Sequence, residues 1–167
     1  PSKSDYASPL QFRFKCTKLP TVEFFVQSAN IPGVNLGSAQ QNTTLYDIPL
    51  PGDKLTFAAL DLSFLVDENL NNYKEIHDWL LGLGFPNTNE QFQNLQASGT
   101  EGGIYSDAIL TVLNSKNIAK TEIRFQNIYP TSLGSLNYDV RQTDVDYLSA
   151  SVSFNYMNYD IVQISTT

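Results

Sequence analysis

The stretch from residue 60 to residue 83 changes its hydrophobic spacing halfway along, and this change constrains the fold more than any other part of the chain. In its first half Leu60, Leu62 and Phe64 alternate with mostly polar residues, which predicts a strand with one buried face. In its second half the apolar side chains recur three and four residues apart, which lines one side of a helix. The members of this stripe are Tyr73, Ile76, Leu80 and Leu83.

The limits of the predicted helix are also visible in the sequence. Residues 67–69 (Asp, Glu, Asn) stand where side-chain acceptors can take the unpaired amides of a helix start. Gly82, Gly84 and Pro86 are predicted to end the helix. Trp79, the only tryptophan, flanks the apolar stripe, and we predict that it anchors the helix against a sheet.

Most of the remaining chain has the composition and spacing of strands. Aromatic residues make up 12% of the chain and charged residues only 16%, which is typical of strand-rich proteins. We therefore expect a mainly β protein with one packed helix. The predicted strands cover residues 10–18, 22–29, 105–114, 120–128 and 149–159, with a turn at 130–134.

Length and charge set further limits. The 167 residues fit one domain, with residues 1–9 as a flexible polar arm. With 10 basic and 17 acidic residues the net charge is −7, which makes a nucleic-acid clamp improbable. The sequence has no apolar stretch long enough for a membrane anchor, and we expect the protein to be made in a cytoplasm.

Residues that carry catalytic or metal chemistry are scarce. Cys16 is the only cysteine and alternates with Phe12 and Phe14, so we expect it in the core without a disulfide. His77 is the only histidine, and no carboxylate stands three or four residues from it to orient it on a helix. We expect no enzyme activity, no metal site and no cofactor.

Two segments have no obvious place in a compact body. Residues 39–53 contain Pro49 and Pro51, which cannot occupy a central sheet position, so we predict a long projecting hairpin. Residues 84–103 are rich in amides and glycine, and predict either an interaction surface or local disorder. A β body also leaves open strand edges, which copies of one chain can satisfy by closing into a ring.

Several motifs, in their order and spacing, resemble the tail tube proteins of contractile-tailed bacteriophages of the T-even type. The matching pieces span most of residues 10–159. They are FRFKCTKLP (12–20), IPG (31–33), PGDKLTF (51–57), LSFLVDENLNNYKEIHDW (62–79), YSDAILTVLNSKN (105–117), KTEIRFQNIYPTSLGSLNYD (120–139) and SVSFNY (151–156).

The resemblance implies a fold of two packed antiparallel sheets, a β-sandwich or barrel, with one flanking helix and its cap over residues 67–79. It implies that six subunits form a ring whose sheets merge into a β-barrel, and that rings stack into a tube. DNA would pass through the lumen without specific binding, which an acidic wall would favour. The implied partners are a tail sheath protein, a baseplate tube-initiator and a tail terminator, and the implied location is the virion tail, assembled in the host cytoplasm. In the hairpin at 39–53, the candidate subunit-interface residues are Leu45, Tyr46, Asp47 and Pro49.

Two alternatives stay open. The first is a baseplate tube-initiator, or the inner tube of a related contractile injection system; the length of 167 residues favours the plain tube. The second is a monomeric β-sandwich that binds a ligand at the 84–103 loop, where Phe85, Phe92 and Tyr105 could stack on a sugar. The number of subunits in solution separates the second alternative from the tube.

Overall fold

In the computed structural model, one helix packs on a β body made of two layers. The structure describes residues 11–84, 90, 93, 103–114, 116–139, 141 and 147–164. Seven strands form one antiparallel sheet in the order β1-β6-β7-β8-β5-β2, with β9 also paired to β7, and a hairpin forms a second sheet. The elements are β1 (Phe12–Cys16), the 3-10 helix η1 (Val22–Phe24), β2 (Val26–Ala29), β3 (Val34–Asn42), β4 (Asp47–Phe57), β5 (Leu60–Leu65), α1 (Asn71–Gly84), β6 (Ser106–Leu113), β7 (Ala119–Leu133), β8 (Ser149–Asn155) and β9 (Asn158–Gln163).

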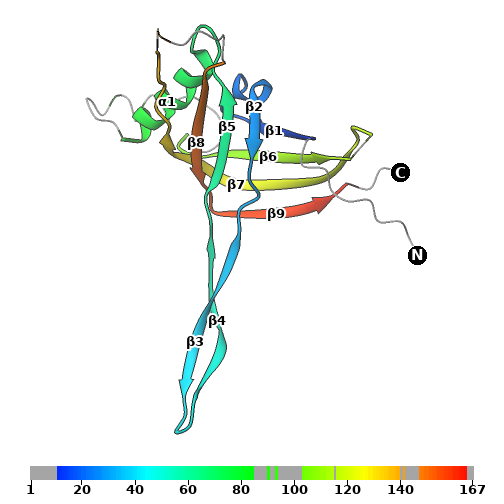
Figure 1. Ribbon diagram of the computed structural model, residues 1–167, viewed down its shortest axis with the longest axis vertical. Coiled ribbons are helices and arrows are strands. Elements are labelled where there is room, and N and C mark those ends of the chain that lie inside the picture. Colours follow the sequence, from blue (N-terminus) through cyan, green and yellow to red (C-terminus); the bar gives the residue numbers. More distant parts are fainter. Residues whose placement is uncertain are drawn as a thin grey trace.

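The long strand β7 belongs to both layers. Its first part pairs with β6 and β9, and its last part pairs with β8. Figure 1 shows the consequence: β1, β6, β7 and β9 run across the direction of β2, β5 and β8. The two layers bury their facing side chains against each other, which confirms the predicted packed antiparallel sheets. The core includes Phe14, Leu110, Ile123 and Phe125 from one layer and Leu62, Phe64, Val152 and Phe154 from the other.

The predicted turn at 130–134 is wrong, because β7 continues through it. Asn127 has a positive φ of 53°, and the pairing with β8 shifts register between Pro130 and Ser132. A proline lacks the amide that a regular ladder needs, and an irregularity of this kind accommodates it. The sequence signal for a turn therefore marks the place where the strand passes from one layer to the other.

Two predicted strands are interrupted by other structure. Residues 22–24 form η1, so only β2 remains of the strand predicted at 22–29. The strand predicted at 149–159 ends at Asn155, and the chain turns a corner where the Met157 amide donates to the Gln126 carbonyl at 3.0 Å. Apolar and polar residues continue to alternate across this corner. The sequence pattern alone therefore does not reveal that β8 and β9 lie in different layers.

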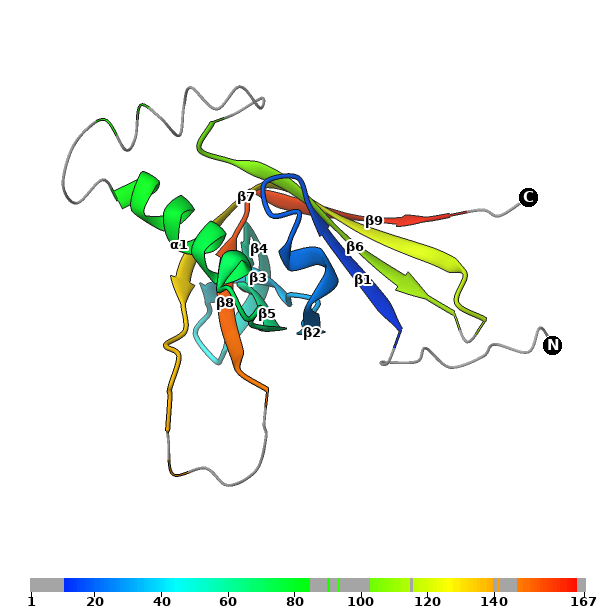
Figure 2. The same cartoon turned by 90° about the horizontal axis from the view of Figure 1, so that it is seen from above.

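The predicted passage from strand to helix is confirmed, since β5 leads into α1. Figure 2 shows α1 lying beside the end of β7 and beside β8. The apolar stripe faces inward, with Ile76 fully buried and Tyr73, Leu80 and Leu83 packed around the core. The prediction that Gly82 ends the helix is wrong, because Gly82 lies buried inside α1. Cys16 is buried in the core, as expected.

The helix begins at Asn71, later than the side-chain acceptors at 67–69 suggested. The connection is held instead by Asn72, whose side chain is completely buried. Its Oδ1 accepts hydrogen bonds from the amides of Asp67 (3.1 Å) and Tyr73 (2.8 Å), and its Nδ2 donates to the Leu65 carbonyl (2.7 Å). One side chain thus replaces the backbone partners that the chain loses between β5 and α1.

Residues 1–9 and most of the 84–103 segment lie outside the described residues, so the predicted arm and loop stay predictions. Within the described part, no helix is long and apolar enough to span a membrane.

Replacing Asn72 is expected to destabilise the whole domain. Asn72→Ala would leave two amides and one carbonyl without partners in a buried place, so we expect a loss of about 3 kcal/mol in the free energy of unfolding. Urea denaturation followed by circular dichroism measures the loss. The control is Asn71→Ala, at an exposed neighbour, which should cost less than about 0.5 kcal/mol. Equal losses for the two variants would contradict the role assigned to Asn72.

Candidate functional site

The hairpin of β3 and β4 takes no part in the packed body. These strands pair only with each other and extend away from the rest of the molecule (Figure 1). All nine residues of β3 are exposed, and β4 is exposed apart from Ile48, Gly52 and Phe57, which are half-buried. The predicted hairpin is therefore present, and it is longer than predicted, because it begins at Val34 and ends at Phe57.

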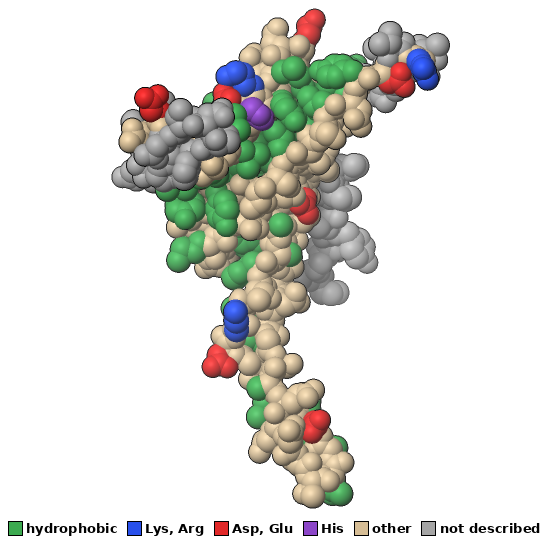
Figure 3. All heavy atoms as spheres, turned by 90° about the vertical axis from the view of Figure 1, so that its left-hand side faces the viewer, with side chains coloured by type: hydrophobic (Ala, Val, Ile, Leu, Met, Phe, Trp, Pro, Cys, Tyr) green, Lys and Arg blue, Asp and Glu red, His purple; other side chains and the backbone are tan. Residues whose placement is uncertain are grey.

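Apolar side chains cover part of this exposed ribbon. The register places Val34 opposite Phe57 and Leu36 opposite Leu55 near the root of the hairpin. Leu36 and Leu55 remain 54% and 53% exposed. Figure 3 shows that few charged side chains interrupt the hairpin surface, which ends in apolar groups at the tip. A two-stranded hairpin is at best marginally stable in water by itself, and in the described part of the chain this ribbon pairs with no further strand.

The structure places the four predicted interface residues at the far end of the hairpin. Leu45 and Tyr46 lie in the turn and are 91% and 68% exposed. The turn is closed by Thr43, whose Oγ1 accepts from the Tyr46 amide at 3.2 Å and donates to the Tyr46 carbonyl. Asp47 and Pro49 follow in β4, opposite Asn42 and Gln40. The hairpin thus presents all four at its end, and their role in an interface stays a prediction.

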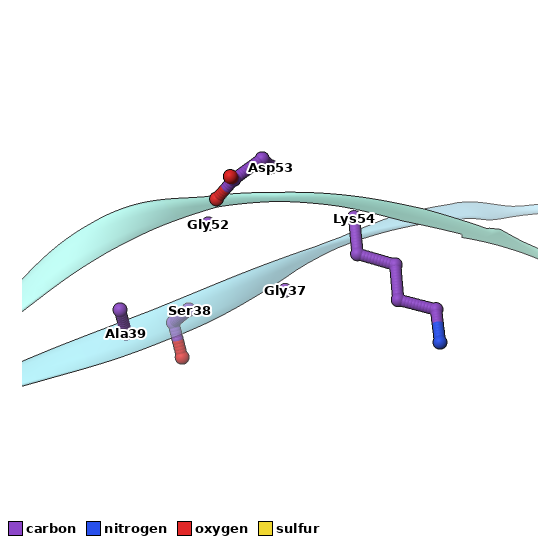
Figure 4. A pocket seen from close by; sticks show the side chains of 6 residues that line it. All are labelled: Gly37, Ser38, Ala39, Gly52, Asp53 and Lys54. Carbon is purple, nitrogen blue, oxygen red and sulfur yellow. The ribbon is translucent and has the colours of Figure 1, made fainter.

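Near the middle of the hairpin, β3 and β4 approach each other unusually closely. Register is lost between the Leu36–Leu55 pair and the Ser38–Pro51 pair, with one residue between them on β3 and three on β4. A Cβ at Gly52 would lie 2.5 Å from the carbonyl oxygen of Gly37. The open hollow beside this crossing is drawn in Figure 4; its lining residues are Gly37, Ser38, Ala39, Gly52, Asp53 and Lys54. The hollow is shallow and follows from the crossing, which only glycine permits.

Two tyrosines from the corner between β8 and β9 hold the root of the hairpin. The Tyr159 hydroxyl donates to the Pro32 carbonyl (2.9 Å), just before β3, and the Tyr156 hydroxyl donates to the Ala58 carbonyl (2.7 Å), just after β4. Both rings contact Phe57, with centroids 6.0 and 5.9 Å away. Each strand of the hairpin is therefore tied to the body at one point, and this sets the direction in which the hairpin leaves.

Burial raises the pKa of Tyr156 to about 12, with the nearby Tyr159 adding to the effect. The neutral hydroxyl, which can donate to Ala58, is the form that the folded protein favours. The sequence gives little sign of these roles, since both tyrosines simply continue an alternating pattern.

Trp79 lies on the other side of the body, buried between α1 and β8. Its ring is 6.3 Å from that of Phe154, and its Nε1 donates to the Ile104 carbonyl at 3.0 Å. Lys18 lies over the same ring at 5.3 Å and donates to the Gly103 carbonyl, and burial lowers the pKa of Lys18. The contacts of Trp79 thus join the helix, the sheet and the chain that returns from the 84–103 segment.

The described residues offer little for catalysis. They contain no group of three His, Cys, Asp or Glu side chains that could hold a metal ion. His77 lies on the exposed side of α1, where its Nδ1 is 3.7 Å from Asp78, and both side chains are about half exposed.

High pH is expected to loosen the root of the hairpin. Because the folded protein raises the pKa of Tyr156 from 10 to about 12, its contribution to stability is complete below pH 10 and is lost as the pH rises toward 12. NMR titration of the tyrosine ring carbons measures this pKa. In Tyr156→Phe this pH dependence should disappear, with a loss of about 1 kcal/mol at neutral pH. Tyr138→Phe, at an exposed tyrosine, is the control. An ordinary pKa for Tyr156 would contradict the burial assigned to its hydroxyl at the root of the hairpin.

Comparison with solved structures finds similar folds in contractile injection machines. A chain from the structure of the anti-feeding prophage baseplate superimposes with a TM-score of 0.65 at 13% identity, covering 95% of this chain and 97% of that one. A chain from the tube-terminating cap of the same prophage gives 0.64 at 14% identity, covering 98% and 95%. A chain from the sheath-tube complex of the extracellular contractile injection system PVC gives 0.58 at 12% identity, covering 95% and 93%. At these identities the likeness shows a shared fold.

Comparison with curated protein sequences finds no match. The family model described as phage tail tube protein matches residues 8–162, which is nearly the whole chain. This confirms the resemblance seen in the ordered sequence motifs. The chain belongs to the phage tail tube protein family.

Proposed function

We propose that this chain is the subunit of the inner tail tube of a contractile bacteriophage, in which hexameric rings stack into a conduit for DNA. The observation that supports this best is the hairpin, which the body holds at its root and leaves uncovered along its length. A second copy of the chain would bury the apolar ribbon. Leu45, Tyr46, Asp47 and Pro49 would then make contacts with the neighbouring subunit or ring.

Open strand edges in the body support assembly into a ring. Within the described residues, β1, β2 and β9 each pair with a partner on one side only. Such edges invite pairing with another chain, and a closed ring removes them. Ring closure would thus satisfy backbone groups that one copy leaves open.

The layer formed by β1, β6, β7 and β9 turns its second face away from the core. If this layer forms the wall of the tube, that face lines the lumen. It carries both signs of charge, including Arg13, Lys15 and Arg124 as well as Glu122 and Asp160. Arg124 is also paired with Glu122 at 2.8 Å. We therefore infer a wall of mixed charge, although the chain is acidic as a whole, and a lumen that passes DNA without specific binding.

The proposed partners follow from the machines in which similar folds occur. The solved structures named above include a sheath-tube complex, a baseplate and a tube-terminating cap. For this chain we propose a sheath protein around the tube, a baseplate tube-initiator at one end and a terminator at the other. The protein would act without enzymatic activity, in the virion tail, after assembly in the host cytoplasm.

The second candidate is a tube-initiator in the baseplate. It is favoured by the match to a chain from a baseplate structure, of which this chain covers 97%. Because a chain of nearly equal length occurs in such a structure, the length of 167 residues does not separate the two functions. A tube subunit should add many rings to itself, whereas an initiator should stop after few.

Electron microscopy of the purified protein, with its mass measured by light scattering, tests the proposal. We expect six-fold rings or hollow tubes, because the exposed hairpin and open edges favour association. Replacing the tip residues, in Leu45→Ser with Tyr46→Ser, should weaken stacking while leaving the circular dichroism spectrum unchanged. A protein that stays monomeric at every concentration, even with preformed baseplates, would contradict the proposal and favour the monomeric binding module.

Assembly should also depend on the glycine crossing inside the hairpin. In Gly52→Ala the added Cβ would meet the Gly37 carbonyl at 2.5 Å, so the strands must separate and the hairpin must change its course. We expect a loss of rings or tubes in electron micrographs while the body remains folded. Gly33→Ala is the matched control, because nothing lies within 4 Å of a Cβ there. Normal assembly of Gly52→Ala would show that the shape of the hairpin is not needed.

A further inference from the structure

Four aromatic rings meet where the hairpin joins the body, beside the corner between β8 and β9 (Figure 1). Phe57 ends β4, Phe125 lies in the buried core on β7, Tyr156 lies in the corner and Tyr159 lies in β9. The ring centroid of Phe125 is 5.1 Å from that of Tyr156 and 5.6 Å from that of Tyr159, and the two tyrosines are 5.8 Å apart. Phe57 contacts both tyrosines from the hairpin side. We call these four residues the root cluster.

The strand β9 depends on the root cluster for its hold on the core. Each of its six residues is exposed or half-buried, and within the described residues β9 pairs with β7 on one side only. Of its side chains, only that of Tyr159 packs against the buried core in the part of the molecule that the structure describes. Tyr159 lies opposite Phe125 in the pairing with β7, and its hydroxyl donates to the Pro32 carbonyl. The residue that fixes β9 therefore also fixes the root of the hairpin.

The hairpin depends on the same cluster. Its two chains are joined at the root, where the Ala58 amide donates to the Gly33 carbonyl at 3.0 Å. Phe57 is half-buried, and its ring contacts the rings of the two tyrosines. If the hairpin swung away, the Pro32 and Ala58 carbonyls would leave the tyrosine hydroxyls, and a polar group without a partner in a partly buried place costs free energy. An ordered hairpin root and an ordered β9 therefore favour each other.

We propose that the root cluster couples the hairpin to β9, so that a neighbouring copy that covers one of them orders the other. This inference rests on the proposed tube assembly, in which both elements are contact surfaces. A neighbour that packs on the hairpin binds the state in which the two carbonyls meet the tyrosine hydroxyls, and that state also holds β9 against β7. Coupling of this kind is reciprocal, so a neighbour that binds β9 favours the ordered hairpin by the same factor.

The remaining strands of the body are held independently of this coupling. Phe154, near the end of β8, is fully buried, and Phe125 on β7 is only 1% exposed. The Met157 amide binds the Gln126 carbonyl and so fixes the corner to β7 through the backbone. These contacts hold β7 and β8 whether or not the hairpin is in place. Loosening of the hairpin root is therefore expected to spread along β9 and to stop at the corner.

Hydrogen exchange of the isolated full chain tests the coupling from the hairpin side. Phe57→Ala removes the hairpin ring from the root cluster and changes no residue of β9. The amides of β9 should then exchange about tenfold faster, because two ring contacts are lost and local opening sets the exchange rate. The matched control is Leu55→Ala, which removes an exposed apolar side chain two residues away on the same strand and should leave β9 unchanged. The amides of β5, β6 and β8 should exchange at wild-type rates in both variants.

Tyr159→Phe tests the coupling from the side of β9. It keeps the ring and removes the hydrogen bond to the Pro32 carbonyl. The amides at the hairpin root, that of Ala58 among them, should then exchange about fivefold faster. Tyr138→Phe, at a tyrosine that is 73% exposed, is the control and should leave these amides unchanged.

Unchanged exchange of β9 in Phe57→Ala, with the variant folded, would overturn the coupling. If Phe57→Ala instead loosens every strand, Tyr159→Phe decides, and root amides that exchange as in the wild type would overturn the coupling. These measurements use the isolated chain, so they do not depend on ring formation. A wild-type protein that never forms rings would overturn the proposed function itself, and the exchange rates would still measure the coupling.

Discussion

Open hydrogen-bonding groups at strand edges are the constraint on which this structure depends. A sheet that ends in β1 on one side and β9 on the other leaves backbone amides and carbonyls facing outward, and water or another strand must satisfy them. The strand β7 crosses between the layers and so leaves each layer only a few strands wide. An isolated copy therefore carries a complete core together with incomplete edges.

The hairpin of β3 and β4 also leaves groups uncovered, in this case apolar side chains. Its strands satisfy each other, but its apolar side chains have no core to enter, and only its root is held by the body. The hydroxyls of Tyr156 and Tyr159 bind one carbonyl on each side of the root, and both rings pack on Phe57. The corner from β8 to β9 thus links the hairpin to an open edge strand, so two candidate contact surfaces share one anchor.

Sequence spacing could predict the parts of the fold that depend on local burial. The β5 to α1 passage and the buried Cys16 follow from hydrophobic periodicity, and the hairpin follows from prolines that exclude a central strand. Periodicity could not predict that Pro130 continues a strand or that the chain turns at Met157, because both depend on which layer lies nearby. The roles of Asn72, Gly52 and the two tyrosines were also hidden, since they consist of contacts between residues distant in sequence or hydrogen bonds to backbone groups.

We propose that the hairpin becomes stable only when another copy of the chain covers it. Hydrogen exchange of the amides in β3 and β4, compared between the isolated and the assembled protein, tests this most directly. The account predicts rapid exchange in the isolated protein, apart from the tyrosine-held root, and strong protection after assembly, while the core strands are protected in both. Equal protection of the hairpin in the isolated protein would contradict the claim, because the hairpin would then need no partner.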